Sequence, residues 1–506
     1  MTLRMKRLIY IYIFIILASA SGTAQQKADI LTRRICHSNL ETNVATWRYG
    51  NPALMKDRFT SSLSMVNASW RYNSQQEARL IEEGDGSNRA GIEAKAFVKK
   101  GSNDIWGEAG YDFGQRRNVK MNESSDYQTV YPYVTADLVG GDLHEENYRF
   151  SGGFAHTLKG GLTLGAYASY KALLAYRTID PRPRNLTSDL DFAAGMRWRW
   201  LGMALKAGKY KQTNVVKFYN ETSQPTVYHA TGLGTDYYRF RGANTNTYYN
   251  GRNFGIQADA ASSLGKFTDF GIHVAYDYSG IDKIISSLNE LPMASVTEQR
   301  INAAAHILTH VAATNTLAVE AVISRTQRDG DENIFGEAEN NIYPEIASLT
   351  MFRRSITEGS LLLAYEHTLG AVRIQASATG GYASDRWRYT EPERLMESDA
   401  AIAGVDAAVA WRSKQWTLSA EAGASARICT SSKLAIPESD MVALNASVEQ
   451  QYLLMANNDC TYHAAAQADF AMKPSLGIFC RLAWTGLRYA GSANASNYEA
   501  TIGLVF

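Results

Sequence analysis

Side chains that could carry out covalent chemistry lie along this chain without the spacing that catalysis requires. Nucleophilic hydrolysis needs a serine, a base and an orienting group within hydrogen-bond reach, but the sequence has no Gly-x-Ser-x-Gly elbow. Histidines that could act as bases occur singly on predicted strands, where a lone histidine is more often a wall residue: they are His156, His273, His306 and His310. We therefore predict no catalytic residue and expect that the protein is not an enzyme.

Metal and cofactor sites lack their sequence signals as well. The segment 144–146 begins with a histidine, but the second histidine of a zinc motif is missing four residues later. Glycine pairs such as 152–153 follow no phosphate-loop spacing. The cysteines, none of them in a C-x-x-C pair, are Cys36, Cys429, Cys460 and Cys480. A disulfide between Cys429 and Cys460 and free thiols are both open alternatives. We predict no metal and no cofactor.

Arginines are the clearest candidates for ligand contacts. In the loop 180–185 two prolines stiffen the backbone. The arginines in and beside this loop are Arg177, Arg182 and Arg184. Together they would form a compact positive patch, and the guanidinium fork matches carboxylate and phosphate groups. The alternative is a loop that folds inward and pairs its arginines with Asp189 and Asp191.

The elements that must position these residues are strands with one apolar and one polar side. Between residues 191 and 200, the apolar Phe192, Met196 and Trp198 alternate with polar or small residues. The same alternation runs through 148–154 and 416–427. Successive side chains of a strand point to opposite faces, so the pattern fits a lipid-facing exterior and a polar lumen. The charges predicted to face the lumen are Arg149, Arg197, Arg199 and Glu421.

The two ends of the chain favour a membrane barrel over a soluble β-sandwich, which would show the same alternation. The last strand, 496–506, is apolar on one side and reaches the aromatic Phe506, and an unpaired edge in lipid would be very costly. It resembles the C-terminal signature of bacterial outer-membrane barrels, which implies that Phe506 is an assembly signal. Residues 1–24 have the basic, apolar and small-residue regions of a secretory signal peptide, for which cleavage after Ala24 or after Ala20 would fit and Ala24 is preferred.

Connections of alternating length predict the organisation of the barrel. Short turns, near residues 160, 202, 314 and 370, alternate with long polar stretches at 219–250, 281–297, 328–357 and 390–400, which is the rule for periplasmic turns and external loops. We predict about sixteen strands, within a range of fourteen to eighteen, over residues 58–506. The predicted strands 441–453, 460–471, 475–488 and 496–506 are one too many for an even number. Residues 25–57 are predicted to be a periplasmic extension or a small hatch in the lumen.

Charge and composition agree with this class. The chain has a net charge of +1 and 29 tyrosines among 506 residues. Removal of the basic signal peptide would leave the mature chain slightly acidic, which argues against a nucleic-acid partner. Tyrosine is abundant in the interface girdles of membrane barrels. The expected partners are outer-membrane lipid and lipopolysaccharide, the barrel assembly machinery and, as an option, a surface lipoprotein or receptor.

A known group shares several of these features. The hatch motif before the first strand consists of Asn51, Pro52 and Ala53, and it resembles the N-P-A motif of FadL-like long-chain fatty-acid transporters. With the loop 180–185 and the segments 188–190 and 251–253, the chain is similar to a family of uncharacterised Bacteroidetes outer-membrane β-barrel proteins. The resemblance implies a fold and a location in the outer membrane. The polar inward face departs from the fatty-acid transporters and argues against a fatty-acid substrate.

Three functions follow from this reading, in order of preference. The first is passage or uptake of a small solute through a narrow or loop-occluded lumen, with the predicted lumen charges setting its selectivity. The second is a non-conducting surface scaffold that holds a lipoprotein, a receptor or a secretion complex through its long loops. The third is an outer-membrane hydrolase.

Overall fold

The computed structural model describes residues 28–220, 222, 225–242, 246–264, 267–340, 342–437, 442–490 and 494–506. The expected signal peptide, residues 1–24, lies outside this part of the chain. Within it, no helix is both long and apolar enough to span a membrane.

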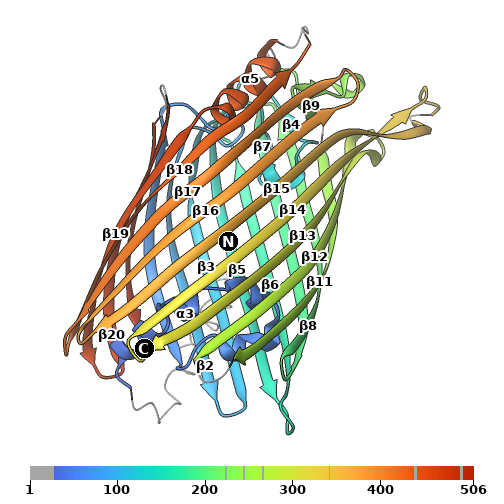
Figure 1. The fold of residues 1–506 in the computed structure, drawn as a ribbon. Coiled ribbons are helices and arrows are strands. Elements are labelled where there is room, and N and C mark those ends of the chain that lie inside the picture. Colours follow the sequence, from blue (N-terminus) through green and yellow to red (C-terminus); the bar gives the residue numbers. More distant parts are fainter. Residues whose placement is uncertain are drawn as a thin grey trace.

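Eighteen antiparallel strands form one closed sheet in the described part of the chain (Figure 1). Each barrel strand pairs with the next one along the chain, and the last pairs with the first. The strands are β1 (Leu63–Gln75), β2 (Gly86–Lys100), β3 (Asn103–Val119), β5 (Gly141–Thr157), β6 (Leu162–Tyr176), β7 (Arg182–Trp198), β8 (Leu201–Lys217), β11 (Thr247–Leu264), β12 (Thr268–Ile285), β13 (Leu291–Ala312), β14 (Asn315–Phe335), β15 (Glu345–Leu369), β16 (Val372–Tyr389), β17 (Arg394–Arg412), β18 (Trp416–Ala435), β19 (Asp459–Lys473), β20 (Leu476–Tyr489) and β21 (Asn494–Val505). The predicted all-β barrel is confirmed, and its strand number is at the upper end of the predicted range.

The outer surface of the barrel is apolar, as the alternation predicts. Ile92, Phe192, Trp198 and Ile502 are each more than half exposed, whereas the intervening positions face the lumen. A water-soluble protein seldom exposes a continuous apolar belt of this extent. The fold is therefore that of a transmembrane β-barrel.

The sheet closes at the last residues of the chain. Met65 of β1 is in register with Val505 of β21. The Phe506 amide donates to the Ser64 carbonyl at 2.8 Å, and the Ser64 amide donates to the Phe506 carbonyl at 3.2 Å. The backbone is thus hydrogen-bonded up to Phe506, as expected for a closing strand.

The predicted strand 441–453 is wrong, because this segment forms helix α5 (Val442–Ala456). Its sequence is rich in Ala, Leu, Glu and Gln, which favour helix over strand. Leu444 and Val448, four residues apart, are both buried, and the helix packs against β17 and β18 at the long-loop end of the barrel (Figure 1). Without this segment, the alternation of short turns and long loops leaves an even number of strands.

Several predicted external loops are instead the outer parts of strands. Most of 281–297 belongs to β12 and β13, and most of 390–400 belongs to β17. Their polar composition is nevertheless explained, since the part of a strand outside lipid needs no apolar outer face.

Two groups of non-barrel elements lie inside the ends of the cylinder (Figure 1). Residues 28–62, here called the hatch, lie at the short-turn end and contain α2 (Ile30–Cys36), α3 (Leu40–Asn43), η1 (Thr46–Gly50) and η2 (Pro52–Asp57). Residues 120–140 and 225–242, here called the cap, lie at the long-loop end and contain α4 (Tyr127–Val130), β4 (Thr135–Ala136), β9 (Tyr228–Gly232), β10 (Thr235–Asp236) and η3 (Tyr238–Phe240). Strand β9 pairs with both β4 and β10, so the two halves of the cap form one unit.

Candidate functional site

The predicted motif at residues 51–53 fixes the hatch to the barrel wall. The Asn51 side chain accepts a hydrogen bond from the Ala53 amide at 3.0 Å and so caps η2, which starts at Pro52. Its Nδ2 donates to Asp259 Oδ2 at 3.3 Å and to the Met196 carbonyl at 3.4 Å. Asn51 is completely buried, so this one side chain both starts a helical turn and holds it against the wall.

Three glycines on the lumen face make room for this motif. They are Gly165 of β6, Gly195 of β7 and Gly202 of β8. A Cβ at Gly195 would lie 2.0 Å from Asn51 Oδ1, and one at Gly165 would lie 2.4 Å from the Ala53 nitrogen. Real Cβ atoms do not approach other heavy atoms so closely, so both positions require glycine. The sequence signal of this docking notch is glycine at lumen-facing positions of three consecutive strands. The notch was not predicted from this signal.

A second contact joins the hatch to the wall through aromatic rings and a carboxylate. The Trp47 ring lies 4.6 Å from the His273 ring, and its Nε1 donates to Glu320 Oε1 at 3.0 Å. Glu320 also accepts from the Ala45 amide at 2.7 Å. His273 is held by Asp259 at 2.8 Å, the same carboxylate that binds Asn51.

The four candidate histidines contact hatch or wall residues that hold the fold together. His273 and His306 both face Trp47 of the hatch. His310 lies 3.1 Å from Glu41 of the hatch, and His156 contacts Asn103 at 2.7 Å. Three of the four thus touch the hatch, a relation that only the folded chain reveals.

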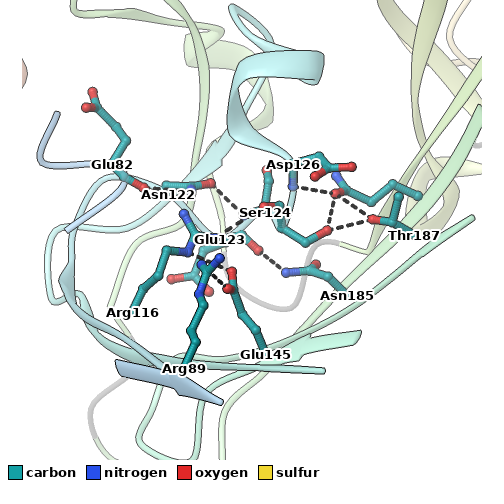
Figure 2. A network of polar contacts seen from close by, with 12 residues as sticks. Glu82, Arg89, Arg116, Asn122, Glu123, Ser124, Asp126, Glu145, Asn185 and Thr187 are labelled. Atoms are coloured by element: carbon teal, nitrogen blue, oxygen red, sulfur yellow. Dashed lines mark hydrogen bonds and ion pairs between the residues drawn. The ribbon is translucent and has the colours of Figure 1, made fainter. Parts of the chain in front are cut away.

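The cap is held to the barrel by a buried polar network (Figure 2). Arg177 donates to Glu123 Oε1 at 2.9 Å and to Asp137 Oδ2 at 3.2 Å. Asn185 and Asn214 each donate to the Glu123 carbonyl at 2.6 Å. Glu123 and Asp137 are fully buried, so the guanidinium compensates two carboxylates that water does not reach.

The same network continues around the neighbouring strands (Figure 2). Glu145 of β5 accepts from Arg89 of β2 and, at 2.7 Å, from Arg116 Nε of β3. Arg116 in turn donates to the Ser125 carbonyl of the cap at 3.2 Å. Asp126 of the cap pairs with Lys171 of β6 at 3.0 Å. The cap is thus joined to several adjacent strands by charged groups.

The arginines around the loop 180–185 do not form the predicted patch. Arg177 points into the cap network, whereas Arg182 pairs with Asp180 at 2.7 Å and stacks on the Tyr219 ring. Arg184 lies on the opposite face of β7 from the lumen. The alternative pairing with Asp189 and Asp191 is also wrong. Arg177 does not pair with either of them because it binds Glu123 and Asp137, two buried carboxylates of the cap that lie far from it in the sequence.

Of the predicted lumen charges, three face the lumen as ion pairs. Arg149 binds Asp112 of β3 through two hydrogen bonds of 2.7 and 3.1 Å, Arg197 pairs with Asp57 of the hatch, and Glu421 pairs with Arg481 of β20. The prediction for Arg199 is wrong, because it lies in the turn after β7, at a positive φ, with its guanidinium over the Trp198 ring. All four cysteines are free, so the disulfide considered for Cys429 and Cys460 is absent.

A chamber of about 810 Å³ lies inside the barrel beside the hatch, and all of its lining residues belong to the hatch or to the wall strands from β1 to β13. Its aromatic lining includes His37, Tyr49 and Phe59 from the hatch and Phe97, Trp106 and Tyr167 from the wall. Three ion pairs lie in its lining, Lys95–Glu108 at 3.6 Å, Lys206–Asp277 at 3.7 Å and Arg300–Glu298 at 3.1 Å, beside the further charged residues Arg58 and Asp191. Such a lining suits a small solute that has both polar groups and an apolar face.

One ion pair connects the chamber to the cap. Glu298 lines the chamber and accepts from Arg328 of β14 at 2.6 Å. The other end of the Arg328 guanidinium donates to the cap carbonyls of Gln128 at 2.6 Å and Tyr131 at 3.0 Å. A solute that competes for Glu298 would therefore change the contacts of an arginine that holds the cap.

Comparison with known proteins adds a family but no activity. A family model described only as a family of unknown function matches residues 52–506. No curated protein matches the chain. The match confirms an uncharacterised family, whereas neither a Bacteroidetes source nor a FadL-like relationship follows from it.

Solved structures with similar architecture are outer-membrane receptors and channels. The ferric preacinetobactin receptor BauA from Acinetobacter baumannii is 8% identical, with a TM-score of 0.40 over 88% of this chain and 80% of that one. A mutant ferric enterobactin receptor, PfeA from Pseudomonas aeruginosa, is also 8% identical, with a TM-score of 0.37 over the same shares. The CymD monoaromatic hydrocarbon channel is 10% identical, with a TM-score of 0.34 over 94% and 96%. Likeness this low says nothing about what this barrel carries.

Proposed function

The chain belongs to this family of unknown function, DUF6850, and we propose that it admits a small polar solute across the bacterial outer membrane through a lumen with a gate. The short-turn end, with the hatch, faces the periplasm, because short turns are periplasmic in such barrels. The cap then lies at the cell surface and acts as the gate.

The observation that carries the proposal is the chamber between the hatch and the barrel wall, which Arg328 links to the cap. A barrel that only held partners through its loops would need no interior space, and filling of the lumen by side chains would make it more stable. Instead, an interior of about 810 Å³ is lined by aromatic rings and by the ion pairs of Glu298 and Lys206. We infer that a solute binds there before it passes the hatch.

The contacts of the cap suit a gate better than a permanent plug. Its anchoring residues are charged or amide side chains, among them Arg177, Glu123 and Asn185, and hydrogen bonds of this kind can be exchanged for bonds to water or to a solute. Arg328 links these contacts to the chamber through Glu298. Occupancy of the chamber can therefore change the stability of the closed cap.

A scaffold function is the second candidate, and one observation favours it. The hairpin formed by β14 and β15 has exposed apolar side chains near its tip: Ile334, Ile342, Ile346 and Leu349. Apolar residues outside the lipid belt are typical of surfaces that bind another protein. A hydrolase has no comparable support, since the candidate histidines pack against the hatch or Asn103.

The test is single-channel conductance of the refolded protein in a planar bilayer containing potassium chloride. Replacement Arg177→Ala leaves Glu123 and Asp137 buried without their cation, so we expect the cap to open and the time in the conducting state to rise at least tenfold. Arg182→Ala is the matched control, because this arginine is partly exposed and its partner, Asp180, lies outside the cap. A folded Arg177→Ala barrel that carries no current would overturn the proposal and favour the scaffold.

A further inference from the structure

Three adjoining cavities lie beside the hatch, along the wall formed by β16 to β19. Their volumes are about 690, 170 and 300 Å³ from the short-turn end inward. Arg373 and Ala410 line both the first and the second cavity, and Gln375, Ala408 and Glu421 line both the second and the third. The shared lining shows that the three cavities form one row.

This row lies across the barrel from the strands that hold the Asn51 motif. On the Asn51 side, Gly195 and Gly202 bring the backbone into direct contact with the hatch. On the β16–β19 side the lumen face is built from short side chains: Ala408, Ala410, Ser419 and Ala465. These short side chains leave open space between the hatch and this wall, which the hatch meets through long side chains such as Arg34 with Asp469 and Arg412 with Asp29. The hatch thus packs directly on the backbone of one wall and leaves cavities along the other.

Charge is unbalanced at the middle cavity of the row, here called the narrow cavity because it has the smallest volume of the three. It is lined by Arg34 of the hatch, Arg373 of β16 and Arg481 of β20, against Glu421 of β18 alone. Arg481 is paired with Glu421, and Arg34 lies 3.5 Å from Asp469. The narrow cavity therefore has a positive lining.

Arg373 is the arginine without a carboxylate. Its guanidinium donates only long hydrogen bonds, of 3.4 to 3.5 Å, to the Ile35 carbonyl and to the carbonyl and hydroxyl of Ser38. Across the described ranges of the chain, no carboxylate lies within ion-pair distance of it. A guanidinium in this state is free to bind a passing carboxylate or phosphate.

The charges on either side of the narrow cavity would help an anion to leave. The inner cavity contains Asp406, 3.2 Å from His463, so an anion is not retained there. The outer one contains Arg373, Arg412 and Lys414 against two carboxylates, Glu366 and Asp29, which pairs with Arg412 at 2.8 Å, so basic groups are in excess by one. A basic exit beyond a basic constriction gives an anion successive sites of contact, which conduction requires.

We propose that this row of cavities is the route by which a small anionic solute, one with a carboxylate or phosphate group, passes the hatch while the hatch stays in place. Arg373 is the residue that selects the anion. The inference rests on the proposed function, since the solute must first be admitted by the cap.

The experiment measures ion preference in the barrel whose cap is opened by Arg177→Ala. Reversal potential in a potassium chloride gradient gives the permeability of chloride relative to potassium. We expect chloride to be preferred severalfold, and Arg373→Gln to bring the ratio close to one. Arg373→Lys keeps the charge and should keep the preference, which separates loss of charge from damage to the hatch.

A second pair of variants tests the route itself. Ala408→Trp places a large side chain where the second and third cavities meet and should reduce the current at least fivefold. Ala383→Trp is the matched control, because it lies on the same wall beyond the three cavities. Heat-modifiable migration on a gel establishes that each variant is folded.

The outcomes separate the two proposals. If Arg177→Ala carries no current, the proposed function fails and the route fails with it. If current flows but is unchanged by Ala408→Trp, or if Arg373→Gln leaves the ion preference as it was, the route beside the hatch is overturned while a gated lumen stands.

Discussion

The two closures of this barrel are held by different chemistry. The cap is anchored by fully buried charges, with Arg177 shared between Glu123 and Asp137. The hatch is anchored by shape on one wall, where Asn51 is seated against Gly195, and by more exposed ion pairs, such as Arg412 with Asp29, beside open cavities on the opposite wall. A buried charge network is either complete or strongly destabilised, whereas a notch on one wall can keep a segment in place beside an open path. Under the proposed function, the cap is accordingly the gate and the hatch is the filter.

The largest expected effect comes from breaking the cap network. Removing one partner of a buried ion pair costs about 3–5 kcal/mol, because the remaining charges stay buried. Arg177→Ala should therefore greatly speed amide hydrogen exchange in residues 120–140, measured by mass spectrometry in detergent. Exchange in the hatch should be unaffected if the two closures are independent. Equal loss of protection at both ends would show that they act as one unit, and Arg182→Ala is again the control.

An intermediate effect is expected from filling the notch. The added methyl group of Gly195→Ala would overlap Asn51 Oδ1, and overpacking of this kind costs roughly 1–3 kcal/mol. We expect the hatch to separate from β7 while the barrel stays folded, which a spin-label distance between hatch and wall would detect. Gly404→Ala, where the nearest side-chain atom is 3.2 Å from the added carbon, is the control. An unchanged distance distribution in Gly195→Ala would contradict the docking role of the notch.

The smallest expected effect is a dependence of the cap on pH. Burial raises the pKa of Glu82 to about 7, with a smaller contribution from Glu83, while a hydrogen bond with Tyr127 of the cap opposes the shift. Since the pKa of this carboxyl is higher in the folded state, its stabilising contribution is present below about pH 4.5 and is lost as pH rises through 7. The open time of the channel should thus be longer at pH 8.5 than at pH 5.5. In Glu82→Gln the difference should disappear, and a difference of the same size would exclude Glu82 as its source.

The barrel was predictable because its pattern repeats locally. Alternation such as Phe192 with Asp191 depends only on neighbouring residues and on lipid outside the wall, and it correctly placed Arg149, Arg197 and Glu421 in the lumen. The helix 442–456 was missed because its apolar residues also occur in short runs that resemble a strand. Alternation does not show where a strand ends, so it could not reveal that Arg199 lies in a turn at a positive φ.

The site was less predictable because its contacts join distant parts of the chain. Asn51 was identified, but the glycines that receive it are separated from it by more than a hundred residues, and each looks like an ordinary strand glycine. Arg177 was noted as part of a loop patch, whereas Glu123 and Asp137 determine its position. The cavities beside the hatch are lined by alanines and serines. These residues are common on barrel strands, so the sequence does not mark where the cavities lie.

The pairing of β1 with β21 has a consequence for how the chain reaches this form. Met65 and Val505 are neighbours in the sheet, although almost the whole sequence separates them. Contacts of such high sequence separation make folding slow, and both outer strands present unpaired edges until the last one arrives. These edges stay exposed until the slowest step of assembly is complete, and exposed edges can pair with other chains. A variant that delays closure of the barrel would therefore aggregate more. The stability of the finished barrel would be unchanged.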